Sequence, residues 1–243
     1  MPKPAFKRLV HRQVLAILSR LDAAFLERTR CYFAGGTRIV LELGEYRESR
    51  DIDFLCSDRD GYRALREVVA ARSLGAVATA KLEFARDLRA DQYGIRTIIS
   101  TNGAGLKFEI VREARIDIAG DKVAGIPVRC LTRRHCFAEK FLANADRGLD
   151  ESTLSRDVVD LAHMIEGWSM QDADAGLALA KAAYGDAISR SLDSVIAKLR
   201  DDRAYRSRCI EGLGIVEPDI LTAGLRGLTR LNRVQVSRSE FTD

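Results

Sequence analysis

The sequence predicts an α+β protein with a sheet-bearing first part at 1–131 and a helical second part at 132–243. Runs rich in β-forming residues are concentrated before Leu131, whereas apolar residues spaced three and four positions apart dominate from Thr132 onward. A pair of glycines between a short apolar run and a helical pattern adds a strand, a tight turn and a helix near the N-terminus. The helix beginning at Thr132 can pack back on the sheet and serve both parts.

The first part opens with apolar residues at helical spacing from Phe6 to Phe25, which predicts one amphipathic helix of about five turns. Cys31–Ala34 is a predicted strand, and Ile39–Leu43 a predicted helix that Gly44 ends. The other predicted elements are strands at Asp51–Cys56, Lys81–Phe84, Ile95–Ser100, Leu106–Val111 and near Gly125–Val128, and a helix at Tyr62–Ala71.

The second part contains helical periodicity and no strand pattern. The predicted helices are Thr132–Ala145, Ser155–Ile165, Ala173–Ala183, Ala187–Leu199 and Ile220–Leu231. The polar segment Arg233–Asp243 is expected to be frayed.

The composition is that of an ordinary globular protein, with 47% apolar and 30% charged residues. The longest uncharged stretch is the ten residues from Thr97 to Leu106, too short for a membrane span of roughly 18 residues. The N-terminal residues contain no apolar segment typical of a secretory signal, so we expect a cytoplasmic protein with no membrane partner. Five widely spaced cysteines without a C-x-x-C pair predict buried free thiols rather than disulfides or a zinc site.

The net charge of +4 is concentrated at the front of the chain, where residues 1–50 contain ten Lys or Arg and five Asp or Glu. Such an excess fits a protein that handles phosphate or nucleic acid, but it is far from a dense basic stripe. Charge alone therefore does not decide the function.

The stretch from Phe33 to Leu55 contains the main candidates for phosphate and metal binding. Gly35 and Gly36 let the backbone approach a ligand, and the helix that follows, beginning near Thr37, presents free N–H groups suited to phosphate. In the next predicted strand, alternation places Asp51 and Asp53 on one face. Two adjacent carboxylates repel unless a cation lies between them, and magnesium is the natural occupant.

A third carboxylate comes from a later predicted strand, Leu106–Val111. Lys107 and Glu109 share one face of it, so Glu109 can join the metal site while Lys107 balances charge. The alternative is a solvent-facing Lys/Glu pair with no role in metal binding.

A G-G-[ST] turn followed by a D-x-D strand resembles the DNA polymerase β-like nucleotidyltransferase superfamily, and implies its mixed sheet. Three further motifs, R-x-S-x-D-I-D-F at 47–54, E-K-h-x-A at 139–143 and R-D-x-x-D-L at 156–161, are similar to the AbiEii/AbiGii toxin group. The matching motifs are scattered over 33–161, about half the chain. Glu is less usual than Asp as the third carboxylate.

The resemblance implies roles for residues that spacing alone does not assign. Lys140 would bind the triphosphate, Asp157 would be needed for activity, and Arg47 and Ser49 would contact phosphate or brace the metal strand. Alternatives stay open: Lys140 as a solvated helix lysine, Asp157 as a first-turn acid behind an N-cap at Ser155, and Arg47 and Ser49 as loop residues without a role.

The implied reaction is nucleotidyl transfer. Two magnesium ions, or manganese in their place, would be held by Asp51, Asp53 and Glu109, with Gly35, Gly36, Thr37 and Lys140 holding the β and γ phosphates of a nucleoside triphosphate. The helical part would form one wall of the active-site cleft, with Arg147 and Arg156 facing the metals. The acceptor would be RNA, such as tRNA, and the protein would be the toxin of a toxin–antitoxin or phage-defence system with a cognate antitoxin.

Two other functions fit the same motifs. One keeps the catalysis but changes the acceptor to a small molecule of the antibiotic type or a protein hydroxyl. The other is a catalytically silent nucleotide-binding or antitoxin-binding module. The sequence does not specify the nucleotide, the acceptor or the oligomeric state.

Overall fold

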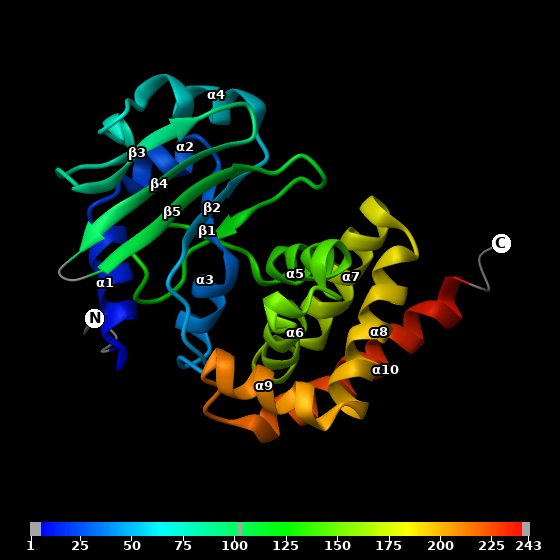
Figure 1. Cartoon of the computed structure of the whole chain (residues 1–243). Helices are drawn as coiled ribbons and strands as arrows, with labels where there is room; N and C mark the ends of the chain where they lie inside the picture. The colour runs from blue at the N-terminus through cyan, green and yellow to red at the C-terminus, as the bar shows by residue number, and fades with distance from the viewer. Residues whose placement is uncertain (1–5, 102–103, 240–243) are drawn as a thin grey trace. The chain divides into compact units, whose positions relative to one another are not determined.

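The computed structural model describes residues 6–101 and 104–239, which divide into two compact units (Figure 1). The first unit takes the chain up to Glu45 and from Ser49 to Thr132, and the second takes Tyr46–Glu48 and the chain from Arg133. The division falls one residue beyond the predicted boundary. No sequence pattern indicates that the three residues Tyr46–Glu48, between the glycine turn and the Asp51 strand, group with the helical unit.

The first unit is built on a seven-stranded mixed sheet with the strand order β3-β4-β5-β2-β1-β7-β6. Its strands are β1 (Cys31–Ala34), β2 (Ile52–Cys56), β3 (Phe84–Ala90), β4 (Gly94–Thr101), β5 (Ala104–Arg112), β6 (Gly120–Asp121) and β7 (Cys130–Leu131). β2 pairs antiparallel with β1 and parallel with β5, so the sheet is mixed, as predicted.

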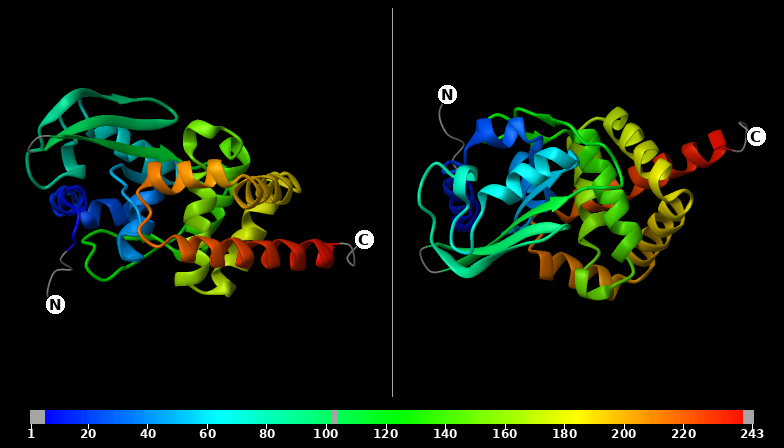
Figure 2. Two further views of the ribbon diagram at one scale, coloured as in Figure 1. Left: turned by 60° about the horizontal axis from the view of Figure 1, so that its bottom comes forward. Right: turned by 90° about the horizontal axis from the view of Figure 1, so that it is seen from above.

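Helices cover one face of this sheet. They are α1 (Leu9–Leu18), α2 (Ala23–Arg28) and α4 (Arg59–Val68), which contribute residues such as Leu18, Leu26 and Leu65 to a core with the inward side chains of β1–β5 (Figure 2, right). Alternation puts Ile52 and Phe54 of β2 in that core with no exposed surface. The opposite face of β2 carries Asp53 and Leu55, which are both partly exposed.

The opening helix is interrupted, contrary to the prediction of one helix over Phe6–Phe25. α1 ends at Leu18, Leu21 forms a bridge with Ala78, and the carboxylate of Asp22 accepts the backbone N–H of Phe25 to cap α2. An N-cap aspartate satisfies free N–H groups and so starts a new helix.

Other element boundaries also differ from the prediction. β3 begins at Phe84, where the predicted strand ended, and Gly125–Val128 is not a strand. The strand in that region is β7, which pairs parallel with β1 through Phe33 and Cys130. α3 (Gly35–Glu42) starts directly at the first glycine and ends before Gly44, which has a φ of +77°.

The second unit is helical. Its α-helices are α5 (Arg133–Arg147), α6 (Arg156–Gly167), α7 (Met170–Tyr184), α8 (Ala187–Asp201), α9 (Arg203–Leu213) and α10 (Pro218–Ser239). A short 3-10 helix, η2 (Glu151–Thr153), lies between α5 and α6 in the chain, and another, η1 (Gly75–Val77), belongs to the first unit. α5 packs mainly against α7, and α6 against α10. Gly224 permits the second contact, because a Cβ there would lie 2.1 Å from the carbonyl oxygen of Ala162.

Two findings correct the prediction for this unit. α9 was not predicted, and α10 continues to Ser239 through the segment expected to be frayed. Residues 240–243 of that segment lie outside the described residues. Among the described helices, none is both long and apolar enough to cross a membrane. The five cysteines are free and buried, as predicted.

Candidate active site

The glycine turn between β1 and α3 lies against the Asp53 carboxylate. Gly35 has a φ of +72°, a conformation that side chains disfavour, and a Cβ built on it would lie 2.4 Å from Oδ2 of Asp53. No side chain caps the N-terminus of α3, since Ala34 occupies the cap position. The turn therefore brings uncapped helix N–H groups next to a carboxylate, and both could contact one phosphate–metal ligand.

Three predicted carboxylates lie on the polar face of the sheet. Asp53 is paired across parallel strands with Glu109 of β5, and Asp51 precedes β2 on the same face as Asp53. All three are partly exposed, while Phe108 between Lys107 and Glu109 is buried. The predicted alternation of both strands is confirmed.

Glu109 is held by two cations. Its Oε1 accepts Nε of Arg96 on β4 at 2.6 Å, and its Oε2 lies 2.5 Å from Nζ of Lys107. Burial would lower the pKa of Lys107, but Glu109 and, at longer range, Asp53 and Asp51 raise it above its ordinary value. The ammonium therefore stays charged next to the carboxylates.

The residues present fit a divalent cation in chemistry but do not form a complete ligand set. Asp51 and Asp53 offer the hard oxygen donors that magnesium prefers. Among the described residues, however, no three His, Cys, Asp or Glu side chains form a group that could hold a metal ion. Both oxygens of Glu109 are paired, so its role as a third ligand stays a prediction that requires it to exchange Arg96 and Lys107 for the metal.

Thr37 and Ser49 are joined by a buried relay that the sequence did not reveal. Their hydroxyl oxygens are 2.8 Å apart, and the backbone N–H of Ser49 donates to Nε2 of His11 at 3.3 Å. Because Nε2 accepts, Nδ1 of His11 carries the proton and donates to Glu45 at 2.7 Å. Burial lowers the pKa of His11 despite this carboxylate, which favours that neutral form. The relay fixes the start of α3 relative to the loop before β2.

The helical unit contains a second group of predicted residues. Nζ of Lys140 on α5 lies 2.8 Å from Oδ1 of Asp157 and 2.7 Å from Oδ2 of Asp160, both on α6. The alternative of a solvated lysine is therefore wrong. Its partners come from another helix, which is why neighbours along α5 gave no sign of them.

Arg47 joins this group at Asp160. Its Nε and Nη2 donate to the two oxygens of Asp160 at 2.7 and 2.8 Å, and the hydroxyl of Tyr46 donates to the same carboxylate at 2.5 Å. Asp160 is completely buried. Arg47 therefore forms an ion pair with Asp160 and is not a loop residue without a role. Its contact with phosphate stays a prediction.

Asp157 has a second cation, since Nε of Arg147 lies 2.8 Å from its Oδ2. Its other proposed role, a first-turn acid behind a Ser155 cap, fits only in part. Ser155 occupies the cap position with a φ of +49°, but its hydroxyl bonds the hydroxyl of Tyr205 instead of capping α6. We call Tyr46, Arg47, Lys140, Asp157 and Asp160, together with the exposed Arg147 at their edge, the buried ionic cluster. Its three cations and two carboxylates leave one net positive charge.

The cluster makes the stability of the unit depend on pH at the acid end. Burial alone would raise the pKa of Asp160, but Arg47 and Lys140 hold it well below its ordinary value, and Lys140 and Arg147 do the same for Asp157. Because both folded pKa values lie below the unfolded value of about 3.9, the stabilisation is present above that pH and is lost as pH falls. We expect the urea-derived free energy of unfolding to fall between about pH 5 and pH 1 less steeply in Asp160→Asn. An equally steep fall in wild type and variant would contradict this account.

The structure therefore groups the predicted residues within each unit. The first unit gathers Gly35, Gly36, Thr37, Ser49, Asp51, Asp53 and Glu109; the second gathers Arg47, Lys140 and Asp157. Sequence reasoning missed His11, Arg96 and Asp160 as partners of these residues. Of the three, only Asp160 had a local signal: it follows Asp157 by three positions, on the same face of one helix.

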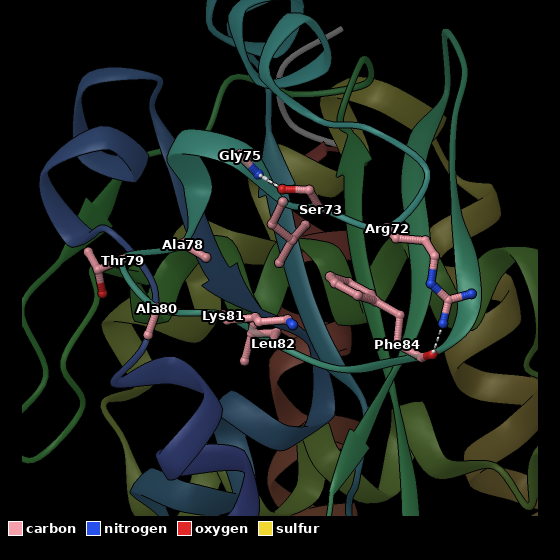
Figure 3. Close-up of a pocket in the computed structure, with 10 residues that line it drawn as sticks. Arg72, Ser73, Gly75, Ala78, Thr79, Ala80, Lys81, Leu82 and Phe84 are labelled. Carbon is pink, nitrogen blue, oxygen red and sulfur yellow. Dashed lines mark hydrogen bonds between the residues drawn. The ribbon is translucent and has the colours of Figure 1, made fainter.

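A hollow of about 320 Å³ in the first unit is separate from these residues. It is lined by the chain from Arg72 to Phe84, including Ser73 and Lys81, and Figure 3 shows its side chains. Arg72 is tied to Asp87 and to the carbonyl of Phe84. None of the predicted site residues lines this hollow, so it adds nothing to the candidate site.

A family model described as the nucleotidyl transferase AbiEii toxin of type IV toxin–antitoxin systems matches residues 16–220. The chain belongs to this family. The match contains every predicted site residue, from Gly35 to Asp157, and extends well beyond the quoted motifs. The protein is thus a toxin-type nucleotidyltransferase, and the functional prediction is confirmed at that level.

Two solved structures share the AbiEii chain's fold. One is a protein from H. pylori described as a nucleotidyltransferase, with a TM-score of 0.53 and 16% identity over 97% of both chains. The other is JHP933 from Helicobacter pylori, with a TM-score of 0.52 and 14% identity over 96% of this chain and 95% of that one. At these identities the likeness shows the fold. None of the curated proteins compared with the AbiEii chain matches it.

Proposed function

We propose that the protein transfers a nucleoside monophosphate from a nucleoside triphosphate to a hydroxyl of RNA, using magnesium held by Asp51 and Asp53. The observation that supports this most is the contact between the glycine turn and Asp53, where a Cβ on Gly35 would strike the carboxylate. The contact supports the proposal because a helix start suited to phosphate and a carboxylate suited to a divalent cation lie next to each other.

The chain's residues have distinct roles in the proposed reaction. The N–H groups of Gly35, Gly36 and Thr37 bind the β and γ phosphates, and Asp51 and Asp53 hold the metal. Bound magnesium would neutralise phosphate charge and lower the pKa of the acceptor hydroxyl. The hydroxyl oxygen forms a bond to the α-phosphorus, the bond from that phosphorus to the bridging oxygen breaks, and pyrophosphate leaves. The hydroxyl proton passes to a carboxylate or to solvent.

Lys140 of the helical unit is proposed to contact the triphosphate, which is the role that the family resemblance implies for it. Lys140→Ala should raise the nucleotide dissociation constant roughly 10- to 150-fold, the effect of losing a charge-assisted hydrogen bond of about 1.5–3 kcal/mol. Folding should survive, since Asp160 keeps Arg47 and Asp157 keeps Arg147.

Isothermal titration with a non-hydrolysable nucleotide analogue measures this effect. Lys181→Ala, on α7, is the matched control and should leave the dissociation constant unchanged. An unchanged constant in folded Lys140→Ala as well would confine Lys140 to the buried ionic cluster and remove it from the nucleotide site.

The acceptor distinguishes the proposed function from its alternatives. A toxin family of type IV systems implies a cognate antitoxin, and RNA is an acceptor whose modification would stop growth. Incubation with each labelled nucleoside triphosphate and total cellular RNA should place label in RNA. Label found in a small molecule of the antibiotic type or in protein would identify that molecule, and not RNA, as the acceptor. The absence of any nucleotide turnover would favour a catalytically silent nucleotide-binding or antitoxin-binding module.

A further inference from the structure

The polar face of the sheet continues beyond the carboxylates as a row of cations. Strand pairing places Glu109 opposite Arg96, and Arg96 opposite Arg89 of the edge strand β3. A second row runs from Lys107 through Ile98 to Arg86. Partners in adjacent strands face the same side of a sheet, so all of these side chains share the face of Asp53. We call Lys107, Arg96, Arg86 and Arg89 the cationic rows (strands in Figure 1).

The opposite face of the same strands is closed by the core. Phe84 and Leu88 of β3, Ile99 of β4 and Leu106 of β5 are all buried there. A bulge in β3 between Phe84 and Arg86 changes the alternation so that Phe84 faces the core and Arg86 faces away from it. The arginines are therefore placed on the open face by a local irregularity as well as by alternation.

Charge on this face increases with distance from the metal strand. Lys107 and Arg96 are paired with Glu109, and Arg96 also lies 3.4 Å from Asp91, so these four side chains carry no net charge. Arg86 and Arg89 are exposed, and within 6–101 and 104–239 neither guanidinium has an ion-pair partner. Like charges brought together without counter-charge are costly unless an anion binds, and the rows thus fit a polyanion better than a single carboxylate.

Sheet order separates this surface from the triphosphate. The glycine turn follows β1, on one side of β2, whereas β5, β4 and β3 lie on the other side. At about 4.8 Å per strand, β3 is about 14 Å from β2. The Gly35 turn is therefore on the β1 side of Asp53, whereas the cationic rows begin on its β5 side. A triphosphate held at the turn would leave that second side for the acceptor hydroxyl.

An exposed aromatic side chain lies in the hairpin that joins the two arginine-bearing strands. Tyr93 is in this hairpin between β3 and β4, three residues before Arg96 in the chain, and is 65% exposed. Basic side chains combined with an exposed aromatic ring are typical of surfaces that bind single-stranded nucleic acid, because the phosphates pair with the cations and a base stacks on the ring.

From these observations we infer that the cationic rows and Tyr93 bind a single-stranded segment of the RNA acceptor and lead its reacting hydroxyl to the carboxylates. The inference rests on the proposed function for the identity of the acceptor. It assigns a binding role to Arg86, Arg89 and Tyr93. A nucleoside triphosphate also carries phosphate groups that these arginines could bind. The experiment therefore measures RNA binding and nucleotide binding separately.

The test measures binding of a fluorescein-labelled oligouridine to the whole chain by anisotropy over a series of KCl concentrations, without nucleotide or metal. The double variant Arg86→Gln/Arg89→Gln should bind roughly 10- to 30-fold more weakly near 0.1 M salt. The log–log slope against salt should be shallower by about 1.4, which is about 0.7 for each lost phosphate contact. Tyr93→Ala should weaken binding roughly 5-fold or more with the slope unchanged, since stacking releases no counterions.

Arg59→Gln/Arg63→Gln is the matched control, because it removes the same charge from exposed positions of α4 on the core side of the sheet. It should bind RNA as wild type does, and all variants should keep the wild-type melting temperature and nucleotide dissociation constant. Equal losses in the two double variants, no RNA binding by wild type, or weaker nucleotide binding with RNA binding intact would each overturn the inference. Because binding is measured without catalysis, none of these outcomes depends on whether Asp53 is catalytic.

Discussion

Asp53→Ala should abolish nucleotidyl transfer and relieve any growth inhibition by the toxin. Asp53 contacts the glycine turn, so its carboxylate is proposed to hold the metal where the phosphates bind. Metal-assisted charge stabilisation amounts to several kcal/mol, which corresponds to a loss of about 10³-fold or more in rate. The melting temperature should stay the same or rise, because the change removes one of two neighbouring like charges.

Asp60→Ala on α4 is the control for this experiment, since that side chain is exposed and lies on the core side of the sheet. It should retain wild-type transfer. Activity is measured with labelled nucleotide and stability by thermal denaturation of the same preparations. Full activity in Asp53→Ala would end the nucleotidyl-transfer mechanism proposed for this face of the sheet.

Asp160→Ala should cause the largest loss of stability of any single change in the buried ionic cluster. Asp160 is completely buried and accepts from Tyr46, Arg47 and Lys140. Removing one partner of a buried ion pair leaves an uncompensated charge and typically costs about 3–5 kcal/mol. For a chain of this size that corresponds to roughly 6–20 °C in melting temperature. Arg47 would be the most affected residue, since Lys140 keeps Asp157.

Asp193→Ala on α8 is the matched control, because Asp193 is exposed. It should change the free energy of unfolding by less than about 0.5 kcal/mol. Urea denaturation followed by circular dichroism measures both variants. A comparable, small effect of Asp160→Ala would show that the cluster adds little to stability. The segment Tyr46–Glu48 would then need another explanation for its place in the helical unit.

The elements predicted well from sequence are those whose pattern is local and strong. β2, β4 and β5 alternate with period two, and the buried residues of β2 and β5 match the predicted faces. α9 was missed because its buried side chains, Tyr205 and Cys209, are too few to give a helical apolar pattern. The break between α1 and α2 depends on a cap at Asp22 and a bridge to Ala78, and apolar spacing does not report either.

The same difference between local patterns and long-range contacts applies to the candidate site. Alternation within one predicted strand was enough to place Asp51 and Asp53 together, and the pairing of β2 with β5 puts Glu109 on their face as expected. The partners of the charged residues were beyond reach, because Arg47 and Asp160 are 113 positions apart and no local pattern joins them. Motifs therefore predicted which residues matter, whereas long-range pairing determined what each one contacts.

The most direct test of nucleotidyl transfer compares two labels on the same nucleotide. Wild-type protein is incubated with RNA, magnesium and a nucleoside triphosphate labelled either at the α or at the γ phosphate. Attack of an RNA hydroxyl on the α-phosphorus predicts that the α label enters RNA, that the γ label leaves as pyrophosphate, and that chelation of magnesium stops both. Entry of the γ label into RNA, or equal α labelling with and without divalent cation, would contradict the proposed reaction at Asp51 and Asp53.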